Sequence, residues 1–402
     1  MDVVVVGAGI VGLGIAWTAV RSGRTVAVVD PSPASGATYA AAGMLAAVSE
    51  LHHQEEDLLE LTLASAALYL RFVESLGVPA WVGYRATSTI TVGADAADRR
   101  SLADLREVQA RHGLAARPLT IREARALEPL LSPRLSCAFS IEADHQVDPR
   151  MLAARLESAI AETVVQHNRA PDPFIRQKAI GLLHEHPADA ASRVTGVSLA
   201  DGSTVTAGEV IVANGLAAAE LGGLPDWLTL PLRPVHGDIL RLRVPDRLRP
   251  LLTATIRGLV RGLPVYLVPR SDGTVVLGAT QREDGSAAVS AGGVHQLLRD
   301  AQVLVPAVVE LDLIEITARA RPGTPDNAPL LGRVARGPGR SGDIQGLILA
   351  TGFFRHGVLL TPIAAEHCLH LLEGGAGTRW ARFRPDRFSH PVPAAQPEGV
   401  RS

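Results

Sequence analysis

Apolar residues along the chain follow two periods, that of buried strands and that of amphipathic helices. Near the N-terminus, the apolar run Val3–Val6 is short enough for a buried strand, and a helical segment beginning near Ile10 follows it. A second strand, residues 25–29, then ends at Asp30. This strand–helix–strand order, with glycines in the first turn, is typical of a dinucleotide-binding βαβ unit.

The first turn has the sequence GAGIVG, and each of its three glycines meets a steric demand. Gly7 allows the tight turn, Gly9 the close approach of a pyrophosphate, and Gly12 the contact between helix and strand. The helix N-terminus favours an anion by about 0.3–1 kcal/mol. Asp30 comes 18 residues after Gly12 and can accept hydrogen bonds from the ribose 2′-hydroxyl of an adenosine. The alternative is a glycine turn in an unrelated α/β protein, which would need none of this context.

Further along the chain the pattern predicts more helices and strands. Residues 231–320 hold several β-rich stretches, which suggest an antiparallel sheet that carries the substrate site. Toward the C-terminus, GLILATG predicts a buried strand, FFR a turn, and the following residues a helix that begins near His356 and faces the same ligand. Residues 166–190 lack firm periodicity and are interpreted largely as loop. The other predicted helices are 57–76, 100–113, 120–127 and 151–161, and the other predicted strands are 87–92 and 204–215.

Composition narrows the possible partners. The chain has 402 residues, of which 47% are hydrophobic, and 39 basic and 41 acidic residues give a net charge of −2. This balance indicates no polyanion-binding surface, so we expect no nucleic-acid partner. The first strand starts at Asp2, without room for a signal peptide, and no window approaches 18 uninterrupted strongly apolar residues. We therefore predict a cytoplasmic protein that does not enter a membrane.

The cysteines and histidines indicate no metal site. Cys137 and Cys368 are the two cysteines, and they lack CxxC spacing, so neither a disulfide framework nor a zinc site is predicted. The thirteen histidines include the adjacent His52 and His53, but none of their spacings is typical of metal ligands. We expect no metal.

The segment that follows the second strand favours FAD over a nicotinamide cofactor. Residues 36–45, GATYAAAGML, are mostly small, where a nicotinamide dehydrogenase would continue into another βαβ crossover. Small side chains allow the backbone to approach a large planar ring. The alternative for this segment alone is an alanine-rich helix start.

Several motifs together resemble one enzyme family. GAGIVG, YAAAGML, VYLVPR, LGAT, ARPGTPDNAPLLGR and ATGFFRHGVLLTP are similar to the glycine oxidases of thiamine biosynthesis. These enzymes belong to the D-amino-acid oxidase and sarcosine oxidase superfamily of FAD-dependent amine oxidases. The motifs extend from residue 3 to about residue 375, so the resemblance covers nearly the whole chain. The RPGT and FRHG blocks are its specific part.

The resemblance implies roles for individual residues. Arg321 matches the arginine that binds the substrate carboxylate, Tyr266 the tyrosine that hydrogen-bonds it, and Arg355 a further active-site arginine. Gln281 lies in the pocket, where the family has a methionine, and this departure leaves the preferred amine open. His236 stands where a lysine or arginine is usual. The residues expected to contact the cofactor are Gly7, Gly9, Ile10, Val11, Gly12, Asp30, Pro31, Ala37, Thr38, Ala42, Gly43, Met44, Ile180, Phe353, Phe354, Arg355, His356, Gly357, Val358 and Leu359.

The expected fold class is α/β, and α+β when the whole chain is considered. A Rossmann-like FAD-binding domain is expected to be interleaved with an antiparallel-sheet substrate domain. The FAD-binding domain is expected from residues 1–85, 145–225 and 320–375, and the substrate domain from 86–144 and 226–319. Residues 389–402 are expected to form a flexible tail.

The resemblance implies oxidation of glycine, and of sarcosine or small D-amino acids, to the imine. Oxygen would be reduced to hydrogen peroxide, and the glycine imine would enter thiazole synthesis. Non-covalent FAD is expected, because Cys368 does not reproduce the motif by which monomeric sarcosine oxidase binds its flavin covalently. A homotetramer is possible by resemblance. The alternatives are a D-amino-acid dehydrogenase or another FAD-dependent amine oxidase, and, from a different class, a non-catalytic FAD-binding subunit.

Overall fold

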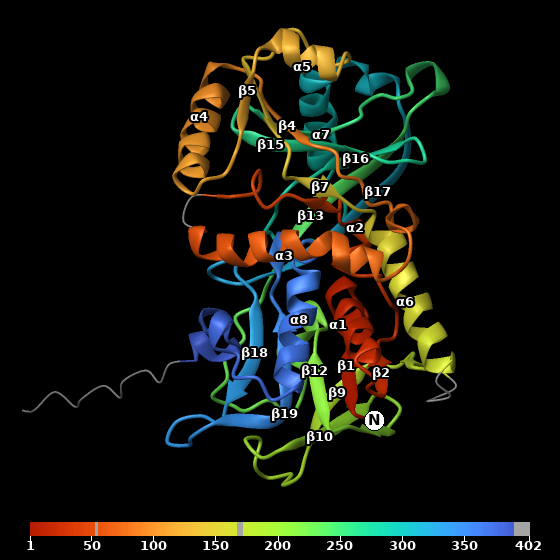
Figure 1. Cartoon of the computed structure of the whole chain (residues 1–402), viewed down its shortest axis with the longest axis vertical. Coiled ribbons are helices and arrows are strands. Elements are labelled where there is room, and N and C mark those ends of the chain that lie inside the picture. The colour runs from red at the N-terminus through yellow and green to blue at the C-terminus, as the bar shows by residue number, and fades with distance from the viewer. Residues whose placement is uncertain (53–54, 167–171, 390–402) are drawn as a thin grey trace, which may run out of the picture.

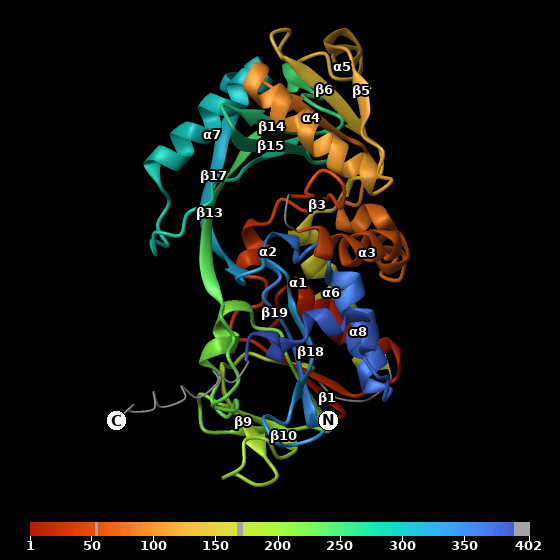
Figure 2. The same ribbon diagram turned by 90° about the vertical axis from the view of Figure 1, so that its left-hand side faces the viewer.

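Two large β-sheets, one toward each end of an elongated molecule, form the framework of the protein (Figures 1 and 2). The structure is a computed structural model of residues 1–402, and it describes residues 1–52, 55–166 and 172–389. Residues 390–402 of the predicted tail lie outside the described residues.

The first sheet has six strands in the order β18-β19-β12-β1-β2-β8. All neighbours are parallel except β18 and β19. The central strand β1 is buried at every residue, as its unbroken valine run predicts. The strands are β1 (Val3–Val6), β2 (Val26–Val29), β8 (Phe174–Ile175), β12 (Glu209–Val212), β18 (Leu330–Ala335) and β19 (Asp343–Thr351).

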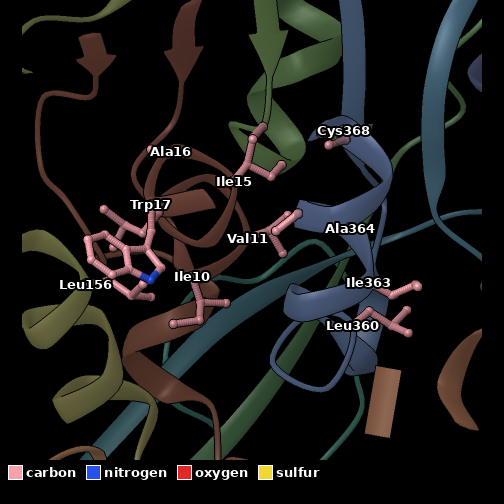
Figure 3. Packing of buried hydrophobic residues seen from close by; sticks show 14 of the residues in the cluster. Ile10, Val11, Ile15, Ala16, Trp17, Leu156, Leu360, Ile363, Ala364 and Cys368 are labelled. Carbon is pink, nitrogen blue, oxygen red and sulfur yellow. The ribbon is translucent and has the colours of Figure 1, made fainter. Parts of the chain in front are cut away.

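Three helices pack on one another beside this sheet. Helix α1 (Ile10–Arg21) lies between α6 (Pro149–Gln166) and α8 (Thr361–Leu372), and Figure 3 shows Val11 toward α8 and Trp17 beside Leu156 of α6. A Cβ atom on Gly14 would overlap Cγ2 of Thr361. The missing side chain at Gly14 therefore lets the start of α8 approach α1 closely.

The second sheet has eight strands in the order β17-β13-β16-β15-β14-β4-β6-β5. The long antiparallel pair β13 and β17 extends from this sheet toward the first one (Figure 2). The strands are β4 (Thr89–Gly93), β5 (Arg117–Leu119), β6 (Cys137–Ile141), β13 (Arg233–Arg243), β14 (Thr255–Val260), β15 (Leu263–Pro269), β16 (Thr274–Gly278) and β17 (Asp312–Gly323). The helices around it are α4 (Ala96–Arg111), α5 (Ile121–Leu127) and α7 (Ala291–Leu304).

Helix α3 (Glu56–Glu74) crosses between the two sheets (Figure 1), and the short helix α2 (Ala37–Ala40) packs against β17. Two small sheets complete the fold. The first joins β9 (Ala179–His184), β10 (Val194–Leu199) and β11 (Thr204–Thr206), and the second pairs β3 (Met44–Leu45) with β7 (His145–Gln146).

Two sequence-based predictions need correction, and a third is incomplete. The interpretation of residues 166–190 largely as loop missed the strands β8 and β9, and β9 is stabilised by pairing with β10 rather than by strong periodicity of its own. Residues 167–171 of this segment lie outside the described residues. Residues 204–215 form two strands in different sheets, and only β12 lies beside β1. Helix α8 starts at Thr361 rather than near His356, because Pro362 fits only the first turn of a helix.

The predicted α/β fold, with parallel and antiparallel sheets, is confirmed. The domain division remains a prediction, and β17 crosses its expected boundary at residue 320. No helix in the described part of the chain combines the length and apolar character needed to cross a bilayer.

Candidate active site

A cavity of about 880 Å³ reaches from the turn after β1 to the face of the eight-stranded sheet. It is lined by the start of α1, the segment around α2, strands β13, β15 and β17, and the loop that follows β19. Segments that are distant in sequence therefore meet at one site.

One end of the cavity is the glycine turn. Asp30 lines it and accepts hydrogen bonds from the backbone N–H of Ala8 and of Ser32, both at 2.7 Å. The Thr38 hydroxyl accepts the N–H of Ile10 at 2.9 Å, which ties α2 to the first turn of α1. Gly9, Ile10 and Val11 also line the cavity. This end has the strand, turn, helix and acid that a dinucleotide requires.

Gly7 and Gly12, in contrast, are not among the residues that line the cavity. A Cβ atom on Gly7 would lie 2.6 Å from Cα of Asn214, and one on Gly12 would overlap the carbonyl oxygen of Gly7. Gly7 also has a φ of +104°, which side chains rarely tolerate. These two glycines shape the turn and do not line the cavity, and their contact with the cofactor remains a prediction.

The small-residue segment forms one wall. Ala37, Thr38, Ala42, Gly43 and Met44 all line the cavity. Arg270, at the end of β15, is buried and donates to the carbonyl oxygens of Val147, at 2.8 Å, and of Ala42. Burial lowers the pKa of Arg270 to about 10, so the guanidinium remains charged at neutral pH. It fixes the wall to the eight-stranded sheet, although the sequence motif VYLVPR gave no sign of this role.

Arg321 and Tyr266 lie at the other end, on β17 and β15. Neighbouring strands make room for both, because a Cβ atom on Gly237 would lie 2.6 Å from Nη2 of Arg321, and one on Gly278 would lie 2.5 Å from the Tyr266 hydroxyl. Arg321 forms no ion pair with a carboxylate of the described residues, and its Nη1 donates to the carbonyl oxygen of Thr280 at 3.4 Å. Burial raises the pKa of Tyr266 to about 12, so its hydroxyl remains a donor. An unpaired guanidinium beside a phenol can bind a carboxylate.

Arg355 lines the cavity from the loop after β19, but its charge is already compensated. Its guanidinium pairs with Glu55 and also donates to the carbonyl oxygen of Glu50 at 3.4 Å. Phe353, Phe354, Gly357 and Val358 line the cavity beside it.

The far side of this loop is held by α3. The Ser65 hydroxyl donates to the carbonyl oxygen of Leu359 at 2.6 Å, and the Tyr69 hydroxyl to that of Val358 at 3.2 Å. Leu359 and His356 are buried behind the cavity wall and do not line it.

Comparison with protein families decides the class of the protein. The family model described as FAD dependent oxidoreductase matches residues 2–371. The chain belongs to this family of FAD-dependent oxidoreductases.

Relatives of this oxidoreductase include glycine oxidases. It is 32% identical to the glycine oxidase of Geobacillus kaustophilus over 386 residues, covering 92% of this chain and 93% of the relative. A crystal structure of glycine oxidase from that organism matches with a TM-score of 0.82 at 29% identity, covering 96% and 98% of the two chains. The bifunctional protein ThiO/ThiG of Synechocystis is 30% identical over 396 residues. These cover 96% of this chain but 54% of that longer protein.

The oxidoreductase also has cavity residues that sequence reasoning missed. Arg257 on β14 donates to Glu50 at 2.6 Å, and both line the cavity. Burial alone would raise the pKa of Glu50, but the charges of Arg257, His356 and Arg355 outweigh it and hold the pKa at about 2. His52 lines the cavity too, and burial together with Arg355 and Arg257 lowers its pKa to about 4. Their spacing in the sequence contains no motif, so only the fold brings them together.

Some predicted residues lie elsewhere. Ile180, expected at the adenine, is on β9 with 48% of its surface exposed, and neither it nor Pro31 lines the cavity. His236 is buried in β13, bridged through its backbone to Arg282, and does not line the cavity either. Gln281 does line it, as expected, next to Thr280.

Proposed function

We propose that this FAD-dependent oxidoreductase is an oxidase of glycine and of similarly small amines, including sarcosine and small D-amino acids. The substrate would lose two electrons and two protons to become an imine. Water would hydrolyse this imine to the oxo acid and ammonia, or to the oxo acid and methylamine when the substrate is sarcosine. Oxygen would take the two electrons and two protons to give hydrogen peroxide. The observation that carries the proposal is Arg321, a guanidinium in the cavity without a carboxylate partner among the described residues.

The cavity fits FAD at its glycine end. Gly9 before α1 offers no side-chain cap, and the first turn of the helix has no acidic residue. Apart from the N–H of Ile10, which the Thr38 hydroxyl accepts, the first N–H groups of α1 are therefore available to phosphates. Asn214 lines the cavity, and its buried Oδ1 has no hydrogen-bond partner among the described residues. Asp30 would hold the ribose, and Ala42, Gly43 and Met44 the ring, whose chemistry when bound is to accept a hydride from the substrate carbon.

Arg321 and Tyr266 would bind the substrate at the other end. A guanidinium and a carboxylate form a planar, two-point contact, which fixes the orientation of the amino acid as well as its position. The Tyr266 hydroxyl would donate to the same carboxylate from the side. With the carboxylate fixed and the amine neutral, no protein base is required at the substrate carbon.

We also propose non-covalent binding of FAD. Cys368 is on α8 and lies in the hydrophobic core, where burial raises its pKa to about 12. Cys137 is on β6 of the eight-stranded sheet. Neither cysteine lines the cavity. Acid precipitation should release all of the yellow colour into the supernatant, and a yellow pellet would show a covalent bond.

The pathway and assembly are part of the same proposal. The resemblance to the glycine oxidases of thiamine biosynthesis, and the match to one part of a bifunctional ThiO/ThiG protein, favour delivery of the glycine imine to thiazole synthesis. The same resemblance favours a homotetramer. Light scattering during size-exclusion chromatography would distinguish a tetramer from a monomer.

The deciding experiment follows hydrogen peroxide release under air with glycine, sarcosine, D-alanine and D-proline, after a visible spectrum of the purified protein. A flavin spectrum and peroxide from glycine are expected. Reduction of the flavin by these amines without peroxide, and with reoxidation by air only over minutes, would instead identify a dehydrogenase. A matched Arg321→Ala variant with an unchanged KM for glycine would remove Arg321 from the carboxylate site.

A further inference from the structure

Within the described part of the chain, five arginines line the cavity, and acids compensate the charges of three of them. Arg321 has been assigned to the substrate carboxylate, and Arg319 is the other arginine that forms no ion pair with a carboxylate of the described residues. The compensated pairs are Arg257 with Glu50, Arg282 with Asp238, and Arg355 with Glu55.

Arg319 and Arg321 lie two residues apart on β17, so both side chains point to the same face of the strand. Their guanidiniums are nevertheless held in different places. Arg319 donates from Nε to the carbonyl oxygen of Ser35 at 3.0 Å and from Nη1 to that of Ala318 at 2.8 Å. A guanidinium has five N–H groups, so three of those on Arg319 have no acceptor in residues 1–52, 55–166 and 172–389 and can bind a ligand.

Ser35 belongs to the glycine-turn end of the cavity. The next residue back along the chain, Ala34, donates its N–H to the carbonyl oxygen of Ala8 at 3.0 Å, and both Ala34 and Ser35 line the cavity. The anchoring of Arg319 to Ser35 therefore places its guanidinium beside the turn that is expected to receive phosphates. The guanidinium of Arg321, in contrast, donates from Nη1 to the carbonyl oxygen of Thr280, on the segment that follows β16.

Among the residues that the structure describes, the glycine-turn end supplies no other cationic side chain. The cavity residues from 9–11 and from 30–44 include no lysine, arginine or histidine, and Asp30 adds a negative charge. A pyrophosphate brings two negative charges into this region. Backbone N–H groups can hydrogen-bond these charges but do not neutralise them.

We propose that Arg319 binds the pyrophosphate of FAD and supplies the positive charge that the glycine turn lacks. This inference rests on the family's use of FAD and does not depend on which amine is oxidised. A competing role for Arg319 would be to bind a second acidic group of a substrate. Both roles require Arg319 to recognise an anion.

The test measures cofactor affinity rather than turnover. FAD is removed from the full-length protein, and FAD and ADP, which both carry the pyrophosphate, are titrated back alongside adenosine, which does not. Arg319→Ala should raise the Kd of FAD and of ADP about 10- to 100-fold and leave that of adenosine unchanged, because hydrogen bonds to charged groups contribute that much. Arg319→Lys should give an intermediate Kd, since it keeps the charge and loses the planar fork.

The matched control is Arg340→Ala, which removes an exposed arginine that pairs with Asp189 and does not line the cavity. Its Kd values should equal those of the unchanged protein. Thermal melting of each apoprotein checks that the variants are folded.

Two results would overturn the proposal. One is a Kd for FAD and ADP in Arg319→Ala within twofold of the unchanged protein. The other is an unchanged Kd for FAD together with a raised KM for amines that carry two carboxylates, which would assign Arg319 to the substrate. If Arg319→Ala shows the expected losses of FAD and ADP affinity but the unchanged protein does not oxidise glycine, the proposed function is contradicted and this inference stands.

Discussion

The guanidinium of Arg321 occupies the space that a side chain at Gly237 would fill on the neighbouring strand. A Cβ atom there would lie 2.6 Å from Nη2 and 2.8 Å from Cζ of Arg321. Strands β13 and β17 pair Gly237 with Arg319 and Val235 with Arg321, so the guanidinium of Arg321 reaches diagonally onto the neighbouring strand. The orientation of the proposed carboxylate ligand therefore depends on a residue that has no side chain.

Gly237→Ala should displace Arg321 and raise the KM for glycine about 10- to 100-fold, the loss expected when a charge-assisted hydrogen bond is broken. Steady-state peroxide assays would measure it. Gly292→Ala is the control, since its Cβ would meet nothing closer than 3.7 Å. Equal KM values for the two variants would show that the position of Arg321 does not matter for binding.

Tyr266→Phe should raise the KM for glycine about 3- to 10-fold, because it removes one hydrogen bond to the carboxylate and keeps the ring. The raised pKa of Tyr266, about 12, keeps its hydroxyl protonated, so ionisation of this residue should not weaken binding between pH 7 and 10. A KM that rises through pH 10 in the unchanged protein but not in Tyr266→Phe would contradict this.

Glu50→Gln should destabilise the protein by about 3–5 kcal/mol at pH 7, because it removes the carboxylate partner of Arg257, whose side chain is 13% exposed. Urea unfolding would measure the change. Glu60→Gln is the control, since that carboxylate is exposed and forms only a surface pair with Arg379. Equal losses for both variants would show that burial of the Glu50 pair is unimportant.

The same pair predicts a dependence on pH. The carboxyl of Glu50 has a pKa of about 2 in the folded protein against an ordinary 4.5, so folding favours its ionised form. Its contribution is fully present above pH 4.5 and is lost as the pH falls toward 2. The stability difference between the unchanged protein and Glu50→Gln should therefore shrink in that window, and a difference that stays constant down to pH 2 would exclude this assignment.

Ser65→Ala should destabilise the protein by about 1–3 kcal/mol, because it leaves the carbonyl oxygen of Leu359 buried without its donor. The released loop should also shift the visible flavin spectrum, since Val358 lines the cavity next to it. Ser101→Ala, which removes an exposed hydroxyl on α4, is the control. An unchanged spectrum with reduced stability would limit Ser65 to a structural role.

The sequence predicted those parts of the site that depend on short segments. The turn from Gly7 to Gly12 and the acid at Asp30 carry their geometry within thirty residues, so their local pattern was sufficient. The roles of Arg321, Tyr266 and the loop after β19 came from resemblance, and all three line the cavity.

What the sequence did not predict depends on pairing between distant segments. Glu50 and Arg257 are 207 residues apart, and their contact exists only because β14 of the eight-stranded sheet faces the segment after β3. Arg270 is similar, since its partner Ala42 is 228 residues away. The strand β9 was missed for the same reason, because its stability comes from β10 rather than from its own residues.

The strand order of the six-stranded sheet also determines when during synthesis the protein can bind its cofactor. Strand β12 lies between β1, near the start of the chain, and β19, which ends at Thr351. Residues 350–358 then complete the cavity wall. A ribosome must therefore translate nearly the whole enzyme before the cofactor can be enclosed, so flavin capture is expected late in the synthesis of this chain.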